Sequence, residues 1–112
     1  DHVSIHPGCR IGRGTFISSN VNLGHDCVIG AYNWINAGIA IAGGCSIGDA
    51  CFFGVNSSTA HGLRLGARNF IAANTLINRD TLDDQVYLSE AGQLFRLKSS
   101  SFLKFSGMAG QE

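Results

Sequence analysis

His25 and Asp26 are the neighbouring residues whose types best suit proton-transfer chemistry. An imidazole titrates close to neutrality, so it can take a proton and return it at physiological pH. The adjacent carboxylate can hold the ring in place or polarise it. A histidine followed by an aspartate also occurs on outer turns that have no catalytic role. The pair alone therefore does not distinguish a catalytic histidine from an ordinary surface residue. The elements that carry the pair decide where it points.

A repeat of six residues runs through most of the chain and contains this pair. Every sixth residue from Ile5 to Ile77 is large and apolar except Thr59, and the column comprises Ile5, Ile11, Ile17, Leu23, Ile29, Ile35, Ile41, Ile47, Phe53, Thr59, Leu65, Ile71 and Ile77. Four positions after each of these residues comes a second column of mostly small, uncharged residues. Chance rarely gives such regularity at 45% hydrophobic composition.

Short strands that turn sharply every six residues account for both columns. Three strands complete one triangular coil of 18 residues, with the aliphatic side chain inside and the small one near the corner. Coils stack about 4.8 Å apart, and each buries its inner face only against its neighbours. An α-helix needs a period near 3.6, and an antiparallel sandwich shows alternation with irregular turns. The sequence therefore predicts an all-β fold, a parallel β-helix over residues 1–80.

The coil also positions the remaining reactive side chains. His25 and His61 share one slot of the hexad two coils apart, which predicts roughly 10 Å between them along the axis. We therefore expect them neither to contact one reacting atom within a subunit nor to bind a metal together. The four cysteines all occupy the small column and are expected to be buried, reduced fillers in a cytoplasmic protein: Cys9, Cys27, Cys45 and Cys51.

Composition excludes several classes of partner. Eight basic residues balance eight acidic ones without a block of like charge, which argues against a nucleic-acid groove or an anionic membrane surface. No apolar run approaches the roughly 20 residues that a membrane span needs. We therefore expect no nucleic-acid partner and no membrane-spanning segment.

Three segments resemble a known enzyme family. GHDCVIG, INAGIAIAGGCSIG and FGVNSS, between Ile17 and Ile77, are similar to hexapeptide-repeat sugar acetyltransferases related to the sialic-acid O-acetyltransferase, which include bacterial nucleotide-sugar N-acetyltransferases. The resemblance implies a left-handed winding of the β-helix. It also implies acetyl-CoA as co-substrate without a metal, and a homotrimer whose sites lie between two subunits.

The family's roles transfer by position. The resemblance makes His25 the general base that takes a proton from the amine or hydroxyl of a sugar or nucleotide-sugar acceptor, with Asp26 orienting its ring. The acceptor would attack the acetyl thioester directly, while the backbone N–H of Gly43 binds the thioester oxygen. The coenzyme arm would run along four residues: Gly43, Gly44, Val55 and Ala73.

Four further positions are candidates for binding the acceptor: Ser18, Asn22, Trp34 and Asn36. The family often has a second histidine at the position of Trp34, an asparagine at that of Ser18 and a glycine at that of Ala73. These departures affect the identity of the acceptor more than the acetyl chemistry. An indole stacks well on a sugar face, and it packs equally well against a neighbouring subunit.

The hexads stop after Ile77, and residues 81–112 are expected to form a C-terminal capping extension. Residues 86–88 and 94–97 predict a small hairpin, and 99–108 a short amphipathic helix. Its apolar face would cover the open end of the prism or a neighbouring subunit, because an uncovered coil is a sheet edge.

Two other functions compete with the acetyltransferase. A non-catalytic β-helix scaffold would keep the architecture and mediate assembly, and the altered acceptor positions leave room for it. A carbonic anhydrase of the γ class also uses this architecture, but the spacing of its metal ligands is absent.

Overall fold

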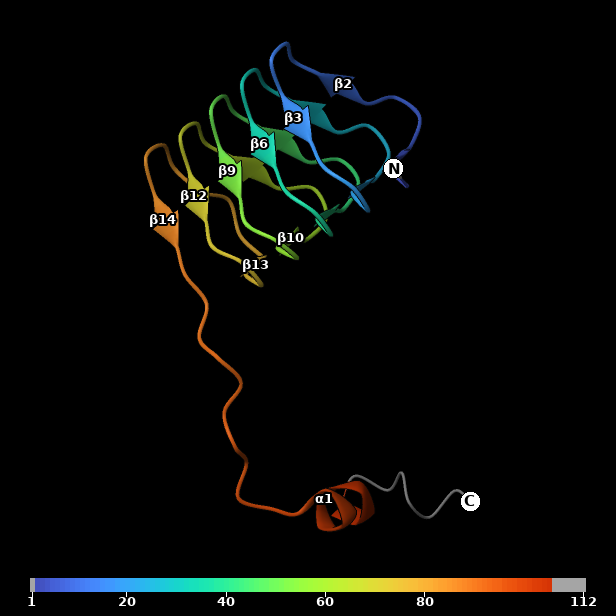
Figure 1. Ribbon diagram of the computed structural model, residues 1–112, viewed down its shortest axis with the longest axis vertical. Helices are drawn as coiled ribbons and strands as arrows, with labels where there is room; N and C mark the ends of the chain where they lie inside the picture. Colours follow the sequence, from blue (N-terminus) through green and yellow to red (C-terminus); the bar gives the residue numbers. More distant parts are fainter. Residues whose placement is uncertain (1, 106–112) are drawn as a thin grey trace.

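The computed structural model describes residues 2–105 and confirms the three-sided coil (Figure 1). Two-residue strands form three parallel sheets, one for each side of a prism. The first sheet holds β1 (Ser4–Ile5), β4 (Asn22–Leu23), β7 (Ala40–Ile41), β10 (Ser58–Thr59) and β13 (Leu76–Ile77). The second holds β2 (Arg10–Ile11), β5 (Val28–Ile29), β8 (Ser46–Ile47) and β11 (Arg64–Leu65). The third holds β3 (Phe16–Ile17), β6 (Trp34–Ile35), β9 (Phe52–Phe53), β12 (Phe70–Ile71) and β14 (Val86–Tyr87).

The register of the sheets follows the predicted 18-residue coil. Asn22 pairs with Ala40 in the first sheet, and Trp34 pairs with Phe52 in the third. Each strand thus lies beside the strand one coil further along the chain, so residues 18 apart form straight columns. This column rule fixes which side chains can meet on the surface of the prism.

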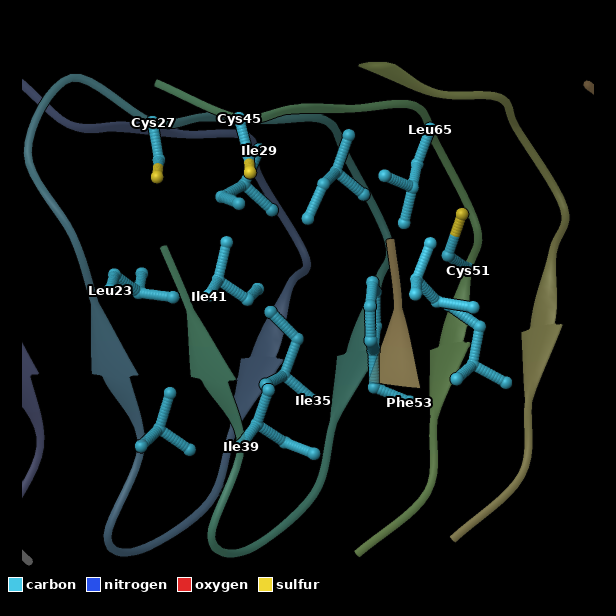
Figure 2. Close-up of a cluster of buried hydrophobic side chains, with 14 residues drawn as sticks. Leu23, Cys27, Ile29, Ile35, Ile39, Ile41, Cys45, Cys51, Phe53 and Leu65 are labelled. Carbon is cyan, nitrogen blue, oxygen red and sulfur yellow. The ribbon is translucent and has the colours of Figure 1, made fainter. Parts of the chain in front are cut away.

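The predicted inward column forms the core (Figure 2). Leu23, Ile35 and Phe53 have no exposed surface, whereas Ile5, in the first coil that the structure describes, is 48% exposed. Thr59, the polar exception in the column, is also buried, and its hydroxyl lies 3.4 Å from the sulfur of Cys45. Burial of the apolar column by stacking therefore holds the prism together.

Cys27, Cys45 and Cys51 are fully buried, as predicted, whereas Cys9 is only partly buried, and all four are free thiols. The Cys27 thiol donates to the carbonyl oxygen of Ala42 at 3.3 Å. Burial raises the pKa of the Cys27 and Cys51 thiols above the ordinary value. Cys27, two residues after His25, is buried inside the prism and is no candidate nucleophile.

The chain after β13 differs from the prediction. The hairpin is wrong, because β14 pairs in parallel with β12, matching Phe70 with Val86 only 16 residues on, and 94–97 form no strand. The last turn is short by two residues, and carboxylates satisfy amides there: Asp80 accepts from the Arg64 N–H and Asp83 from the Ala67 N–H. The helix α1 (Ser99–Phe105) forms as predicted, although positions 106–108 of the expected helix lie outside the described residues.

Helix α1 lies away from the prism and contacts none of its strands (Figure 1). The capping role of 81–112 and the boundary at residue 80 stay predictions. Within residues 2–105, no helix has the length and apolar character needed to cross a membrane.

Candidate active site

The corner between the first and second sheets carries both central histidines. We call it the histidine corner, and it consists of Pro7–Gly8, His25–Asp26, Gly43–Gly44 and His61–Gly62, one pair from each successive coil. Backbone hydrogen bonds tie these pairs together: the Gly44 N–H donates to the His25 carbonyl at 2.8 Å, and the Gly62 N–H donates to that of Gly43 at 3.0 Å. The side chains here thus stand on a hydrogen-bonded scaffold.

His25 and Asp26 form a hydrogen-bonded pair on the outside of this corner. Nδ1 of His25 lies 3.1 Å from Oδ2 of Asp26, and their side chains are 61% and 72% exposed. Asp26 has a left-handed backbone, with φ of 57°, which aspartate tolerates better than most residues. An ionised carboxylate can only accept a hydrogen bond, so this contact favours the neutral tautomer with the proton on Nδ1 and the lone pair on Nε2. The pair therefore presents a proton acceptor to the solvent side.

Gly43 supplies the open space into which that nitrogen points. A Cβ added at Gly43 would lie 2.6 Å from Nε2 of His25, so the ring occupies the place where a side chain would be. Within residues 2–105 the Gly43 N–H has no hydrogen-bond acceptor. A Cβ at Gly24 would sit against the Gly43 nitrogen, so the glycine before His25 keeps this amide clear. A ring nitrogen that can accept a proton thus lies beside a glycine whose amide has no acceptor within residues 2–105.

His61 reaches the same space from the other side. The ring centroids of His25 and His61 are 5.9 Å apart with planes inclined by 52°. The prediction that the two imidazoles stand too far apart to face one reacting atom is therefore wrong. Their backbones lie two coils apart, but Gly43 between them has no side chain, and the rings lean into the gap. A signal for this was present in the sequence, where glycine separates two histidines in one 18-residue column.

The predicted coenzyme residues divide between two corners of the prism. Gly43 and Gly44 belong to the histidine corner, after β7. Val55 and Ala73 follow β9 and β12 and so lie at the corner between the third and first sheets. Val55 is 46% exposed. One protomer does not bring the two groups together.

The candidate acceptor residues gather mainly on the third sheet. The indole N–H of Trp34 donates to the Asn36 side-chain oxygen at 2.9 Å, and the Asn36 amide donates to the Phe53 carbonyl. Trp34 is half exposed and packs against the ring of Phe16, with centroids 4.6 Å apart and planes inclined by 33°. Ser18 lies just beyond β3 in the same sheet, whereas Asn22 lies on the first sheet, in the strand before His25. The Trp34 group and His25 therefore belong to different sides of one protomer.

No group of three or more His, Cys, Asp or Glu side chains that could hold a metal ion occurs within the part of the chain that the structure describes.

Comparisons with known proteins bear on this corner through its architecture. No family model and no curated protein matches the sequence. Serine acetyltransferase from Neisseria gonorrhoeae has a similar structure, with a TM-score of 0.73 at 24% identity over 88% of this chain and 42% of that one. Serine acetyltransferase isoform 3 from Entamoeba histolytica gives 0.70 at 22% identity, over 89% of this chain and 40% of that one. The acetyltransferase domain of PglB from N. gonorrhoeae gives 0.58 at 18%, over 70% and 47%.

The chain has the fold of known acetyltransferases. It spans less than half the length of each of these three solved chains. At identities below 25% the likeness establishes the architecture, and the activity has to be argued from the histidine corner itself.

Proposed function

We propose that this chain is the catalytic β-helix of an acetyl-CoA-dependent acetyltransferase that acylates an amine or hydroxyl of a sugar, which is nucleotide-linked in the version we favour. The observation that carries the proposal is the position of His25 Nε2 beside Gly43, whose N–H has no acceptor within residues 2–105. Acyl transfer needs a base for the incoming nucleophile and a donor for the developing oxyanion. The fold shared with acetyltransferases supports the same chemistry.

The step proposed is a direct attack without an acyl-enzyme. Nε2 of His25 takes the proton of the acceptor's N–H or O–H as that atom bonds to the thioester carbon. Negative charge moves to the carbonyl oxygen, where the Gly43 N–H donates to it. The carbonyl re-forms, the carbon–sulfur bond breaks, and coenzyme A leaves as its thiolate. Asp26 stabilises the imidazolium that His25 becomes.

The division of the coenzyme residues supports a site shared between subunits. Gly43 and Gly44 lie at one corner and Val55 and Ala73 at another, so a single prism cannot line both sides of one arm. In a cyclic homotrimer, the histidine corner of one copy can face the other corner of the next copy. The homotrimer and the left-handed winding are parts of this proposal.

The exposed Trp34 supports a carbohydrate acceptor. Its indole offers an apolar face of the kind that stacks on sugar rings, and the Asn36 amide beside it offers polar groups for hydroxyls. Free cysteines fit a reducing compartment, so we place the reaction in the cytoplasm.

The test is release of free thiol from acetyl-CoA in the presence of a panel of amino-sugar nucleotides. We expect turnover with at least one acceptor, and binding of coenzyme A in calorimetry without any acceptor. Absence of both turnover and coenzyme binding would leave the non-catalytic scaffold as the better account of the chain.

A further inference from the structure

The mechanism above leaves one exposed histidine of the corner without a task. His61 stands one coil beyond Gly43, on the side opposite His25. We propose that His61 is a second catalytic imidazole, which protonates the coenzyme sulfur as the thioester breaks. This inference rests on the proposed acetyltransferase function and adds a named proton donor for its leaving group.

The geometry supports a place for His61 on the leaving-group side. Nε2 of His61 lies 3.7 Å from the position of a Cβ on Gly44, as Nε2 of His25 lies 2.6 Å from one on Gly43. The two imidazoles thus flank the Gly43–Gly44 pair, with the His25 ring next to Gly43 and the His61 ring next to Gly44. A thioester oxygen held by the Gly43 N–H would have the acceptor on the His25 side. Its sulfur, continuing along the coenzyme arm past Gly44, would lie on the His61 side.

A proton donor there assists the departure of the sulfur. An alkyl thiolate departs faster when it is protonated as the carbon–sulfur bond breaks, and an imidazolium is a stronger acid than an alkyl thiol, so it can give up its proton to the sulfur. During one turnover His25 gains the acceptor's proton and His61 loses one to sulfur. The products are the acetylated acceptor and the coenzyme thiol. Both rings are exposed, so solvent returns a proton from His25 to His61 and balances the cycle.

A change of leaving group tests this role. In His61→Gln we expect kcat with acetyl-CoA to fall about 10²–10⁴-fold, the usual contribution of a general acid. With S-acetyl-4-nitrothiophenol, whose acidic thiol leaves without a proton, we expect the same variant to stay within about tenfold of wild type. His25→Ala should lose activity with both donors, because the acceptor must still lose its proton. The acceptor in every assay is the amino-sugar nucleotide that wild type uses best.

The controls separate this inference from the function on which it rests. His6→Gln removes an exposed histidine before the corner column and should behave as wild type with both donors. Far-UV circular dichroism and coenzyme A binding confirm that His61→Gln is folded. An unchanged rate with acetyl-CoA, or equal losses with both donors, would overturn the role of His61 while leaving the acetyltransferase intact. A wild-type protein that releases no thiol from acetyl-CoA would overturn both.

Discussion

At the histidine corner, the side chain that is missing matters as much as those that are present. Pro7, His25 and His61 occupy one column with Gly43, and only the glycine leaves room for an imidazole to lie across it. The same lack of a side chain brings ligand and backbone amide close together. The space beside the His25 ring therefore exists because residue 43 has no side chain.

His25→Ala tests the base directly. Removing the imidazole takes away the proton acceptor but leaves the Gly43 amide in place, so we expect kcat to fall about 10²–10⁴-fold with coenzyme A affinity nearly unchanged. Steady-state thiol release gives kcat, and calorimetry gives the affinity. A variant with wild-type turnover would remove His25 from the mechanism.

Gly43→Ala tests the space itself. The added methyl would lie 2.6 Å from His25 Nε2, so the ring must move off the amide, while Gly43 has no left-handed φ that would strain alanine. We expect the variant to fold and to lose about 10²–10³-fold in kcat. Ala31→Gly changes one methyl at the equivalent slot of the corner between the second and third sheets, away from both groups of candidate coenzyme residues, and serves as the control, with activity retained. Equal activities of the two variants would contradict the role given to Gly43.

At the scale of strands, neighbouring residues separate inside from outside. Phe53 is fully buried in the third sheet, whereas Phe52 stacks on Phe70 on the outer face, with centroids 4.9 Å apart. Phe52 and Phe53 are the two residues of β9. The two-residue strand therefore contains a built-in comparison of core and surface.

Phe53→Ala and Phe52→Ala form the matched pair for stability. Emptying the core position should lower the free energy of unfolding by about 3–5 kcal/mol. Losing the outer stack should lower it by about 0.5–1.5 kcal/mol. Urea unfolding followed by circular dichroism measures both, and a larger loss for Phe52 would mean that the inward register is wrong.

The final turn depends on an ion pair that acid should break. Arg68 Nε donates to Asp84 Oδ1 at 2.6 Å, and this contact lowers the pKa of the Asp84 carboxyl from its usual range. A lowered pKa in the folded chain means that the stabilisation is present above the ordinary aspartate value and is lost as the pH falls through the lowered one. Carbon-13 NMR of Asp84 should show titration at a lower pH than in Arg68→Ala. Identical titration curves would exclude the pair.

The sequence predicted the elements far better than the contacts between side chains. Every inward position from Ile5 to Ile77 could be assigned, because an aliphatic side chain every six residues has only one way to be buried in a three-sided coil. The approach of His25 to His61 could not be derived from backbone spacing, because it depends on ring orientation over Gly43. The parallel pairing of β14 was missed because the last turn is two residues short and Asp80 and Asp83 replace backbone partners there.

At the scale of the whole molecule, the proposal requires more than one copy of the chain. We expect light scattering to give a mass about three times the 11.8 kDa of the chain, as closed cyclic assembly requires. A monomer at micromolar concentration would contradict the shared site, although the corner described here would remain.

Subunit mixing gives a sharper test of sharing. His25→Ala lacks the base at one corner, and Val55→Glu places a charge on the coenzyme path at the other. Each homotrimer should be inactive, whereas mixed trimers contain sites built from the intact corner of each chain. We expect unfolding and refolding together to restore part of the wild-type thiol release. Mixtures that stay inactive would contradict a site shared between subunits.

The uniform hydrogen-bonded ladder between successive coils has an evolutionary consequence. A duplication or deletion of 18 residues inserts or removes one whole layer and returns every later side chain to the same face, so the prism can lengthen in steps. A layer gained beyond residue 79 would leave the imidazole–glycine–imidazole column untouched. A layer lost between the two histidines would instead bring them onto adjacent rungs with no glycine between. The prism can therefore change length beyond residue 79 without altering this column, but not between residues 25 and 61.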